Sequence, residues 1–184
     1  MCLRHGNTSD GVIGYMALGE IFQGAILGRH RTGYEFGRVA LQLLDRYHNT
    51  KHRAEVHFVT GYFATAWMRP VSEAEKLWAV AYQSGLETGD MFHAACACCA
   101  TLQSQLMRGV PFDELWRDSE RSVSFLQQIN NHESLGAVLA VRQTVRNLRG
   151  ATRSAESFDD EEFDEAAYVA DLAGYGSRHF AHYY

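Results

Sequence analysis

The chain has 184 residues, of which 46% are hydrophobic and 21% are charged, as in ordinary globular proteins. This length suggests one domain or slightly more, and the composition excludes a chain that is disordered over most of its length. No apolar run approaches the roughly 18 residues that a membrane span needs. The first seven residues also lack the apolar core of a signal peptide, so we expect a chain without a leader or an anchor.

The charge is unevenly distributed along the chain. The net charge is −5, and seven of the 22 acidic residues lie between residues 156 and 165. Elsewhere 15 acidic residues face 17 basic ones, without the basic stripe that binds a nucleic-acid backbone. Three of the four cysteines fall within residues 96–99, a spacing that does not suit a disulfide framework. We therefore expect a cytoplasmic protein that binds neither nucleic acid nor a membrane.

Apolar residues recur at helical spacing along almost the whole chain. This pattern predicts helices over residues 10–29, 34–48, 52–68, 72–87, 91–108, 112–129 and 133–149, and a short helix over 165–172. No segment alternates with a period of two, so no sheet is expected. The three tryptophans, Trp67, Trp78 and Trp116, lie on the apolar stripes and are predicted to pack between helices.

Local signals mark several helix ends. Ser72 followed by Glu75 is the pattern of a capping box, which predicts a helix start just after Pro70. Gly89 and Asp90 indicate the end of one helix and the N-cap of the next.

The breaks between helices follow a regular spacing. The strongest ones lie at 31–33, 69–71, 109–111 and 150–152, at intervals of roughly 40 residues. Two helices per interval, joined by short turns, are typical of a helical-hairpin solenoid. We predict an all-α fold over residues 1–150, a tetratricopeptide-like right-handed superhelix of about three and a half hairpins. Residues 151–184 are predicted to form a mobile acidic linker, a short helix and an aromatic tail.

Several short motifs, in this order, resemble one known family. They are Gly33-Tyr34-Glu35-Phe36-Gly37 before Ala40-Leu41, Trp67-Met68-Arg69-Pro70, the segment 85–90, and the acidic segment 157–165. Together these motifs are similar to the tetratricopeptide-like helical region of large signalling proteins. In that family the region lies between an AAA-type ATPase module and C-terminal GAF and histidine-kinase modules, and a kinase-like domain often precedes the ATPase. The resemblance implies a non-catalytic module that couples neighbouring domains.

Sequence motifs for catalysis are not evident. There is no phosphate-binding Gly-x-x-x-x-Gly-Lys-Ser/Thr loop, nucleophile elbow or His-Glu-x-x-His sequence, so we expect neither an enzyme nor a bound cofactor. His93, Cys96 and Cys99 follow one another at intervals of three residues on one predicted helix. They support an alternative function, a metal or small-molecule sensor. The competing interpretation is a strip of small residues where helices pack closely.

A solenoid offers an extended surface for a protein, a peptide or neighbouring domains of its own chain. The polar or aromatic residues that we predict to bind such a partner are Tyr15, Tyr62, Gln103 and Arg142. The helix over 133–149 has no complete hairpin after it, so its apolar face is predicted to be uncovered. We expect either self-association through this C-terminal face or a cap formed by the tail residues Phe180, Tyr183 and Tyr184.

Overall fold

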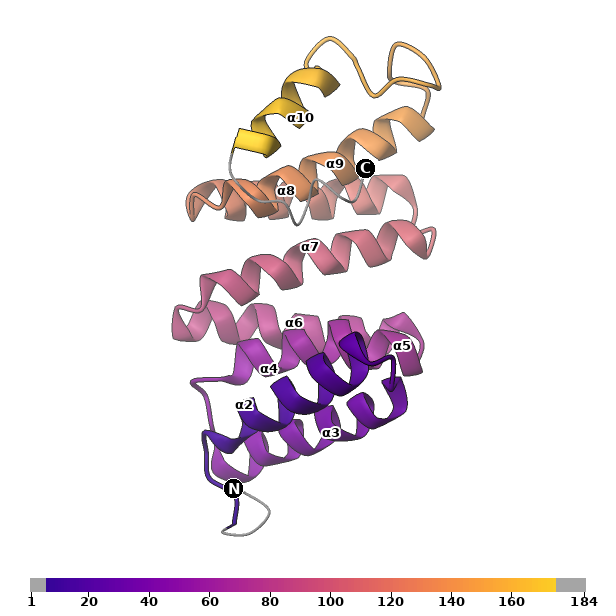
Figure 1. The fold of residues 1–184 in the computed structure, drawn as a ribbon. Coiled ribbons are helices and arrows are strands. Elements are labelled where there is room, and N and C mark those ends of the chain that lie inside the picture. The colour runs from indigo at the N-terminus through magenta and orange to yellow at the C-terminus, as the bar shows by residue number, and fades with distance from the viewer. Residues whose placement is uncertain (1–5, 175–184) are drawn as a thin grey trace. The chain divides into compact units, whose positions relative to one another are not determined.

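The computed structural model describes residues 6–174, except the side chains of residues 171–174 (Figure 1). Its helices are α2 (Gly11–Tyr15), η1 (Met16–Ile26), α3 (His30–Tyr47), α4 (Arg53–Val59), η2 (Thr60–Thr65), α5 (Ala66–Met68), α6 (Val71–Thr88), α7 (Met91–Met107), α8 (Phe112–Gln128), α9 (His132–Leu148) and α10 (Glu165–Gly174). Over these residues there is no strand, only an isolated bridge between Ser154 and Ser157. The prediction of an all-helical chain is therefore confirmed.

Two of the predicted helices contain segments of π-helix. The predicted helix over 10–29 consists of α2 followed directly by η1, and the one over 52–68 consists of α4, η2 and α5. In η1 the amide of Leu27 donates to the carbonyl of Phe22, five residues earlier, at 3.1 Å. Such a bond is characteristic of π-helix, which is rare and is frequently found at functional sites.

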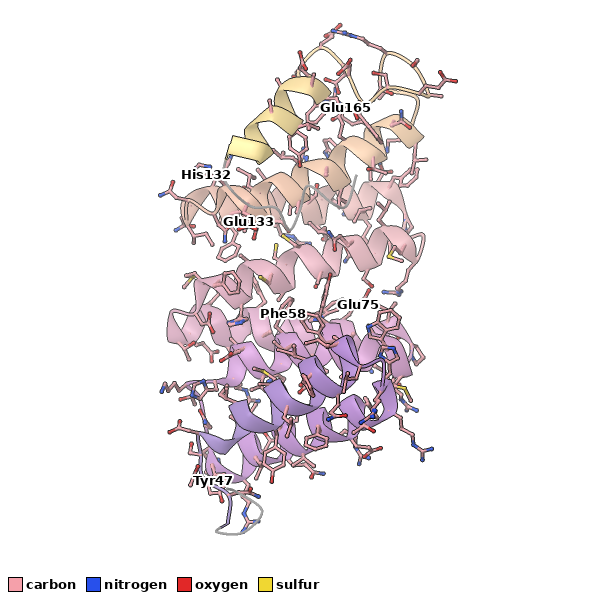
Figure 2. All side chains as sticks on the ribbon, viewed as in Figure 1. Tyr47, Phe58, Glu75, His132, Glu133 and Glu165 are labelled. Atoms are coloured by element: carbon pink, nitrogen blue, oxygen red, sulfur yellow. The ribbon has the colours of Figure 1, made fainter. Side chains whose placement is uncertain are left out.

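The chain divides into two compact units, one ending at Thr101 and the other beginning at Leu102. In the first unit η1 packs against α3 and η2, and α6 packs against α4 and η2. Two apolar clusters form its core. One contains Val12, Met16, Ala40, Leu43, Leu44, Val56 and Val59, and the other contains Ala74, Trp78, Ala81, Ala97 and Ala100. At the end of α3, the hydroxyl of Tyr47 donates to the carbonyl of Asn7 at 2.6 Å (Figure 2).

Glycines bring η1 close to α3. A Cβ atom on Gly33 would lie 3.0 Å from the Cα atom of Gly24 and 3.2 Å from the carbonyl oxygen of Gly19. The two backbones therefore touch at a distance that only glycine permits. This contact corrects the predicted break at 31–33, since Gly33 lies inside α3. The chain turns instead at Gly28, which has a φ of 67°.

The predicted helix ends are partly confirmed. Gly89 has a φ of 82° and its amide donates to the carbonyl of Gly85, so it ends α6 as predicted. The amide of His93 donates to Oδ1 of Asp90 at 3.2 Å, which makes Asp90 the N-cap of α7. Helix α6 begins at Val71, just after Pro70 as predicted. The capping box is wrong, because the N-cap is Pro70 rather than Ser72 and the helix start has no side-chain cap.

The second unit contains α8, α9, α10 and the acidic segment. Helices α8 and α9 pack against each other, and Val138 and Val145 of α9 are buried. The hydroxyl of Tyr168, on α10, donates to the carbonyl of Gly136. The expectation that this face of α9 has no downstream neighbour is therefore wrong. The predicted aromatic cap, Phe180, Tyr183 and Tyr184, lies outside the described residues.

The acidic segment was predicted to be a mobile linker, and this prediction is wrong for the middle of the segment. There, Asp160 is buried against α9. Its Oδ2 atom accepts from Nε2 of Gln143 at 2.7 Å and lies 3.0 Å from Nε of Arg146. Its Oδ1 atom accepts from the amides of Glu162 and Phe163 at 2.7 and 2.9 Å. These bonds fix the segment because they give a buried carboxylate the donors that it needs.

The tryptophans differ in burial. Trp78 is 3% exposed, as predicted, and packs between Ala74 and Ala81. Trp67 is 64% exposed, so its predicted place in the core is wrong. It lies in α5, three residues before the extended Pro70 that starts the next helix, and its ring stacks on His30 at 4.7 Å instead. Trp116 is half-buried between α8 and α9.

We predict that Trp78→Ala lowers the free energy of unfolding by about 3–5 kcal/mol, because it removes a large buried side chain and leaves a cavity. The matched control is Trp67→Ala, which should cost less than about 1 kcal/mol, since Trp67 is largely exposed. Chemical denaturation measures both values. Equal losses for the two variants would contradict the burial difference.

A second pair of variants tests the contact between η1 and α3. Gly33→Ala should lower the free energy of unfolding by about 1–3 kcal/mol, because its methyl group meets the backbone of Gly24. Gly14→Ala has nothing within 4 Å of the added Cβ atom and should raise stability by about 0.5–1 kcal/mol. A neutral or stabilising Gly33→Ala would show that the two helices are not held at this distance.

Candidate functional site

The outer side of η1 is apolar and exposed. The large side chains on it are Leu18, Phe22, Ile26 and Leu27, with exposed fractions of 53, 46, 66 and 45%. The first three follow one another at intervals of four residues, which places them on one side of the helix. We call Leu18, Phe22 and Ile26 the η1 stripe. Exposed apolar surface concentrated on one helix is typical of an interaction site.

The inner side of the same helix carries a buried carboxyl group. Glu20 is 0% exposed, and its Oε1 atom accepts from the hydroxyl of Thr60, in η2, at 3.0 Å. Within the described structure the other oxygen, Oε2, is buried without a hydrogen-bond partner. A Cβ atom on Gly37, in α3, would lie 2.9 Å from Cγ2 of Thr60 and 3.1 Å from Cδ of Glu20. Three segments thus converge on one carboxyl group.

This environment changes the acidity of Glu20. Burial is the main cause, and it raises the pKa of Glu20 from 4.5 to about 8, while the hydrogen bond from Thr60 acts in the opposite direction. The folded protein therefore holds Glu20 as a neutral acid at pH 7. A neutral carboxyl group costs less to bury than a carboxylate, because it carries no charge.

Tyr15 and Tyr62, two of the predicted partner-binding residues, lie in the first unit. The hydroxyl of Tyr15 donates to Oδ1 of Asn7 at 2.9 Å, and its ring lies 6.0 Å from that of Phe36. The ring of Tyr62 lies 5.6 Å from Phe58 and 6.4 Å from Trp78. The two tyrosines pack against different apolar clusters, so they do not form one site with each other. Their role in binding stays a prediction.

Gln103 and Arg142, the other two predicted residues, belong to the second unit. Gln103 is half-buried on α7. The guanidinium of Arg142 lies 4.0 Å from the ring centroid of Trp116, a cation–π contact that joins α9 to α8. Burial lowers the pKa of Arg142, although Glu120 opposes this effect. This geometry assigns Arg142 a packing contact, and a role in partner binding stays a prediction for both residues.

The proposed metal ligands do not form a site. Within the part of the chain that the structure describes, no three His, Cys, Asp or Glu side chains are grouped to hold a metal ion. Nδ1 of His93 lies 2.8 Å from Oδ2 of Asp90, the residue that caps its helix. Cys99 is buried, whereas Cys96 is half-buried rather than buried as close packing predicts. The described geometry thus gives the metal-sensor alternative no support.

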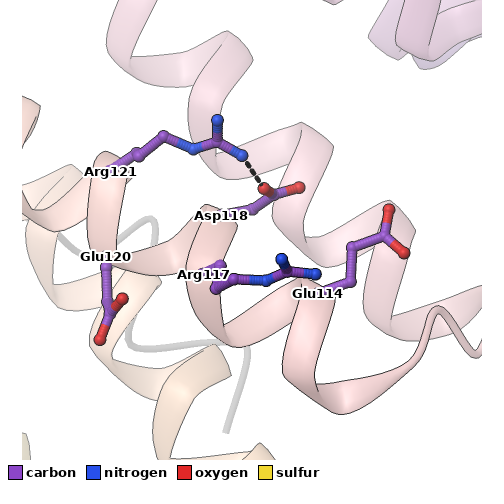
Figure 3. A pocket seen from close by; sticks show the side chains of 5 residues that line it. All are labelled: Glu114, Arg117, Asp118, Glu120 and Arg121. Atoms are coloured by element: carbon purple, nitrogen blue, oxygen red, sulfur yellow. Dashed lines mark hydrogen bonds and ion pairs between the residues drawn. The ribbon is translucent and has the colours of Figure 1, made fainter.

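A shallow pocket on α8 also fails to suggest a ligand. It is lined by five charged residues of that one helix: Glu114, Arg117, Asp118, Glu120 and Arg121 (Figure 3). Arg121 is paired with Asp118, which also accepts from Nε2 of Gln105 at 2.9 Å. Ligand pockets are mostly apolar and are formed by several elements. This surface therefore resembles a solvated helix face.

Sequence reasoning missed both Glu20 and the η1 stripe. One signal for Glu20 was present, since it is the only charged residue between Asp10 and Arg29 in a segment rich in glycine and apolar residues. A single charged residue on such a helix is usually exposed, and where it is buried it needs a hydrogen-bond partner or a shifted pKa. The stripe carried no comparable signal, because periodicity does not say which apolar face is covered.

Comparison of the chain with family models, with curated proteins and with solved structures gave no match. Over residues 6–174, none of the helices combines the length and the apolar character that crossing a membrane requires.

The buried contact of Asp160 gives a prediction about acid stability. The hydrogen bond from Gln143 is the main cause that lowers the pKa of Asp160 below its usual value of 3.8. A carboxyl group whose pKa is lower in the folded state stabilises the fold above its unfolded pKa, and this contribution is lost as the pH falls. Asp160→Asn should therefore reduce the free energy of unfolding by about 1–2 kcal/mol at pH 7 and flatten its decline below pH 4.

The matched control is Glu161→Gln, which changes an exposed neighbour with the same loss of charge. Denaturant unfolding at a series of pH values compares the variants with the unaltered protein. If the free energy of unfolding depended on pH in the same way in Asp160→Asn and Glu161→Gln, the contact of Asp160 with α9 would not contribute to stability.

Proposed function

We propose that the chain is a non-catalytic protein-interaction module that docks an apolar helix of another protein or of a neighbouring module on the η1 stripe. The observation that carries this proposal is the exposure of Leu18, Phe22 and Ile26 on one side of η1. Helical repeats bury their apolar faces against the next repeat, and a terminal repeat that faces water has a polar outer face. The outer side of η1 is instead apolar, which favours an apolar occupant.

The packing inside the first unit supports a repeat architecture for this module. Helix η1 packs against both α3 and η2, and the following helix pair continues with α6 against α4 and η2. Contacts of each helix with the next two are expected of tetratricopeptide-like hairpins. This arrangement, together with the motifs described above, supports assigning the chain to a tetratricopeptide-like solenoid of a large multidomain protein. In such a protein the module would transmit signals between an ATPase or kinase-like domain and a histidine kinase.

Photo-crosslinking in the cells of origin tests the proposal. The probe, p-benzoylphenylalanine, replaces Phe22 in one variant and Met107 in the control. Met107 is 88% exposed but lies in the second unit. We expect a specific crosslink from position 22 and none from position 107. Mass spectrometry should map the crosslinked residue to the apolar face of a helix in another protein or module. The crosslink should be lost when the position-22 probe is combined with Leu18→Ser and Ile26→Ser, which remove the apolar stripe.

Other outcomes would contradict the proposal. Equal crosslinking from the two positions would show that position 22 is not part of a specific surface. A crosslink to a second copy of the same chain would assign the η1 stripe to self-association, and a crosslink to lipid would assign it to a membrane surface.

A further inference from the structure

The carboxyl group of Glu20 lies where η1 meets its two neighbours, and only one of its oxygens is satisfied. The hydroxyl of Thr60 donates to Oε1 at 3.0 Å, whereas Oε2 has no partner among the described residues. A neutral acid tolerates this environment because it carries no charge. A carboxylate in the same place is an isolated buried anion with a single neutral donor, which is strongly unfavourable.

Among the described residues, no charged side chain offsets the burial of Glu20. On α3, Arg38 is exposed and pairs with Glu35 at 3.2 Å. On α4, Nδ1 of His57 lies 2.8 Å from the carbonyl oxygen of Arg53, and burial lowers the pKa of this histidine, so it is neutral at pH 7. On η2 and α2, the titratable side chains are those of Tyr62 and Tyr15, and a tyrosine is never a cation.

The close packing of η1 leaves little space for water or another hydrogen-bond donor to reach a charged Glu20. Gly37 lies directly against the pair formed by Glu20 and Thr60. On the same two helices, Gly24 of η1 touches Gly33 of α3. The backbones therefore already lie at contact distance, and the carboxyl group reaches water only if η1 moves away from α3 and η2.

From this geometry we propose that the proton on Glu20 is a latch that holds η1 against α3 and η2, so that loss of the proton releases the helix. The same helix carries the η1 stripe on its outer side. A rise in pH therefore loosens the surface that we assign to partner docking. This consequence for docking rests on the proposed function, whereas the latch itself is a property of the chain alone.

The direction and size of the effect follow from linkage. With η1 released, Glu20 regains the ordinary pKa of 4.5, and with η1 docked its pKa is about 8. Between these two pH values the state in which η1 is packed against α3 and η2 binds one more proton than the released state. The packing of η1 is therefore strongest below pH 4.5 and weakens as the pH rises. The ratio of docked to released helix falls about tenfold per pH unit over this interval and is constant above it.

Hydrogen exchange of the η1 amides, residues 16–26, measures this ratio as a protection factor corrected for the intrinsic exchange rate. In the unaltered protein we expect the protection factor to fall about tenfold per pH unit between pH 5.5 and 7.5. In Glu20→Gln, which keeps the size of the side chain and cannot ionise, this fall should disappear. His57 remains in that variant, and any slope it causes has the opposite sign, because protonation of a buried neutral histidine destabilises at low pH.

Glu35→Gln is the matched control, since it removes an exposed carboxylate of α3 and should keep the slope of the unaltered protein. The latch is refuted if Glu20→Gln retains that slope. A second measurement needs no variant: a ¹³C NMR titration of the Glu20 carboxyl should give a midpoint near 8. A midpoint near 4.5 would refute the latch as well. Neither measurement involves a partner, so failure of the latch and failure of the crosslinking test are distinguishable.

Discussion

The close contact between η1 and α3 is the constraint on which the first unit depends. Gly24 and Gly33 let the two backbones touch, and Gly37 lies against the carboxyl group of Glu20, which is fully buried. Among the described residues, Thr60 of η2 is the one group that donates a hydrogen bond to Glu20. The same contact decides which side of η1 faces outward. The apolar stripe and the buried carboxyl group are thus two consequences of one helix packing.

The π-helical geometry of η1 and η2 fits this arrangement. Glu20 and Thr60 form a buried hydrogen bond that links the two π-helical segments of the unit. A π-helix has less favourable backbone geometry than an α-helix, so it persists where local packing favours it. Here the wider helix presents glycines to α3 and a polar side chain to η2. Helix η1 thus combines a π-helical backbone with a buried ionisable group, and the release that we propose for it rests on these two features.

Most of the secondary structure could be predicted, because the apolar period of these helices is clear and turn residues separate them. The start of α3 could not, since Gly33 looks like a helix breaker in sequence and serves as a packing contact in the structure. The position of Trp67 could not be predicted either: helical spacing places it on the apolar stripe, but in the structure it lies near the end of α5, largely exposed and stacked on His30. For the site, the lone charge of Glu20 was visible, but its burial depends on glycines of another helix.

The acidic segment shows why charge density alone does not predict mobility. Asp160 and Glu20 are both buried carboxyl groups, yet their pKa values are displaced in opposite directions. Asp160 accepts hydrogen bonds from Gln143 and from two backbone amides and lies beside Arg146, so its anionic form is stabilised. Glu20 accepts one hydrogen bond from a neutral hydroxyl, so its neutral form is favoured instead. Burial is the main cause of the raised pKa of Glu20, whereas the hydrogen bond from Gln143 is the main cause of the lowered pKa of Asp160. Acid therefore weakens the contact that orders the segment in the second unit, whereas the contact that we propose for Glu20 in the first unit weakens as the pH rises from 4.5 to about 8.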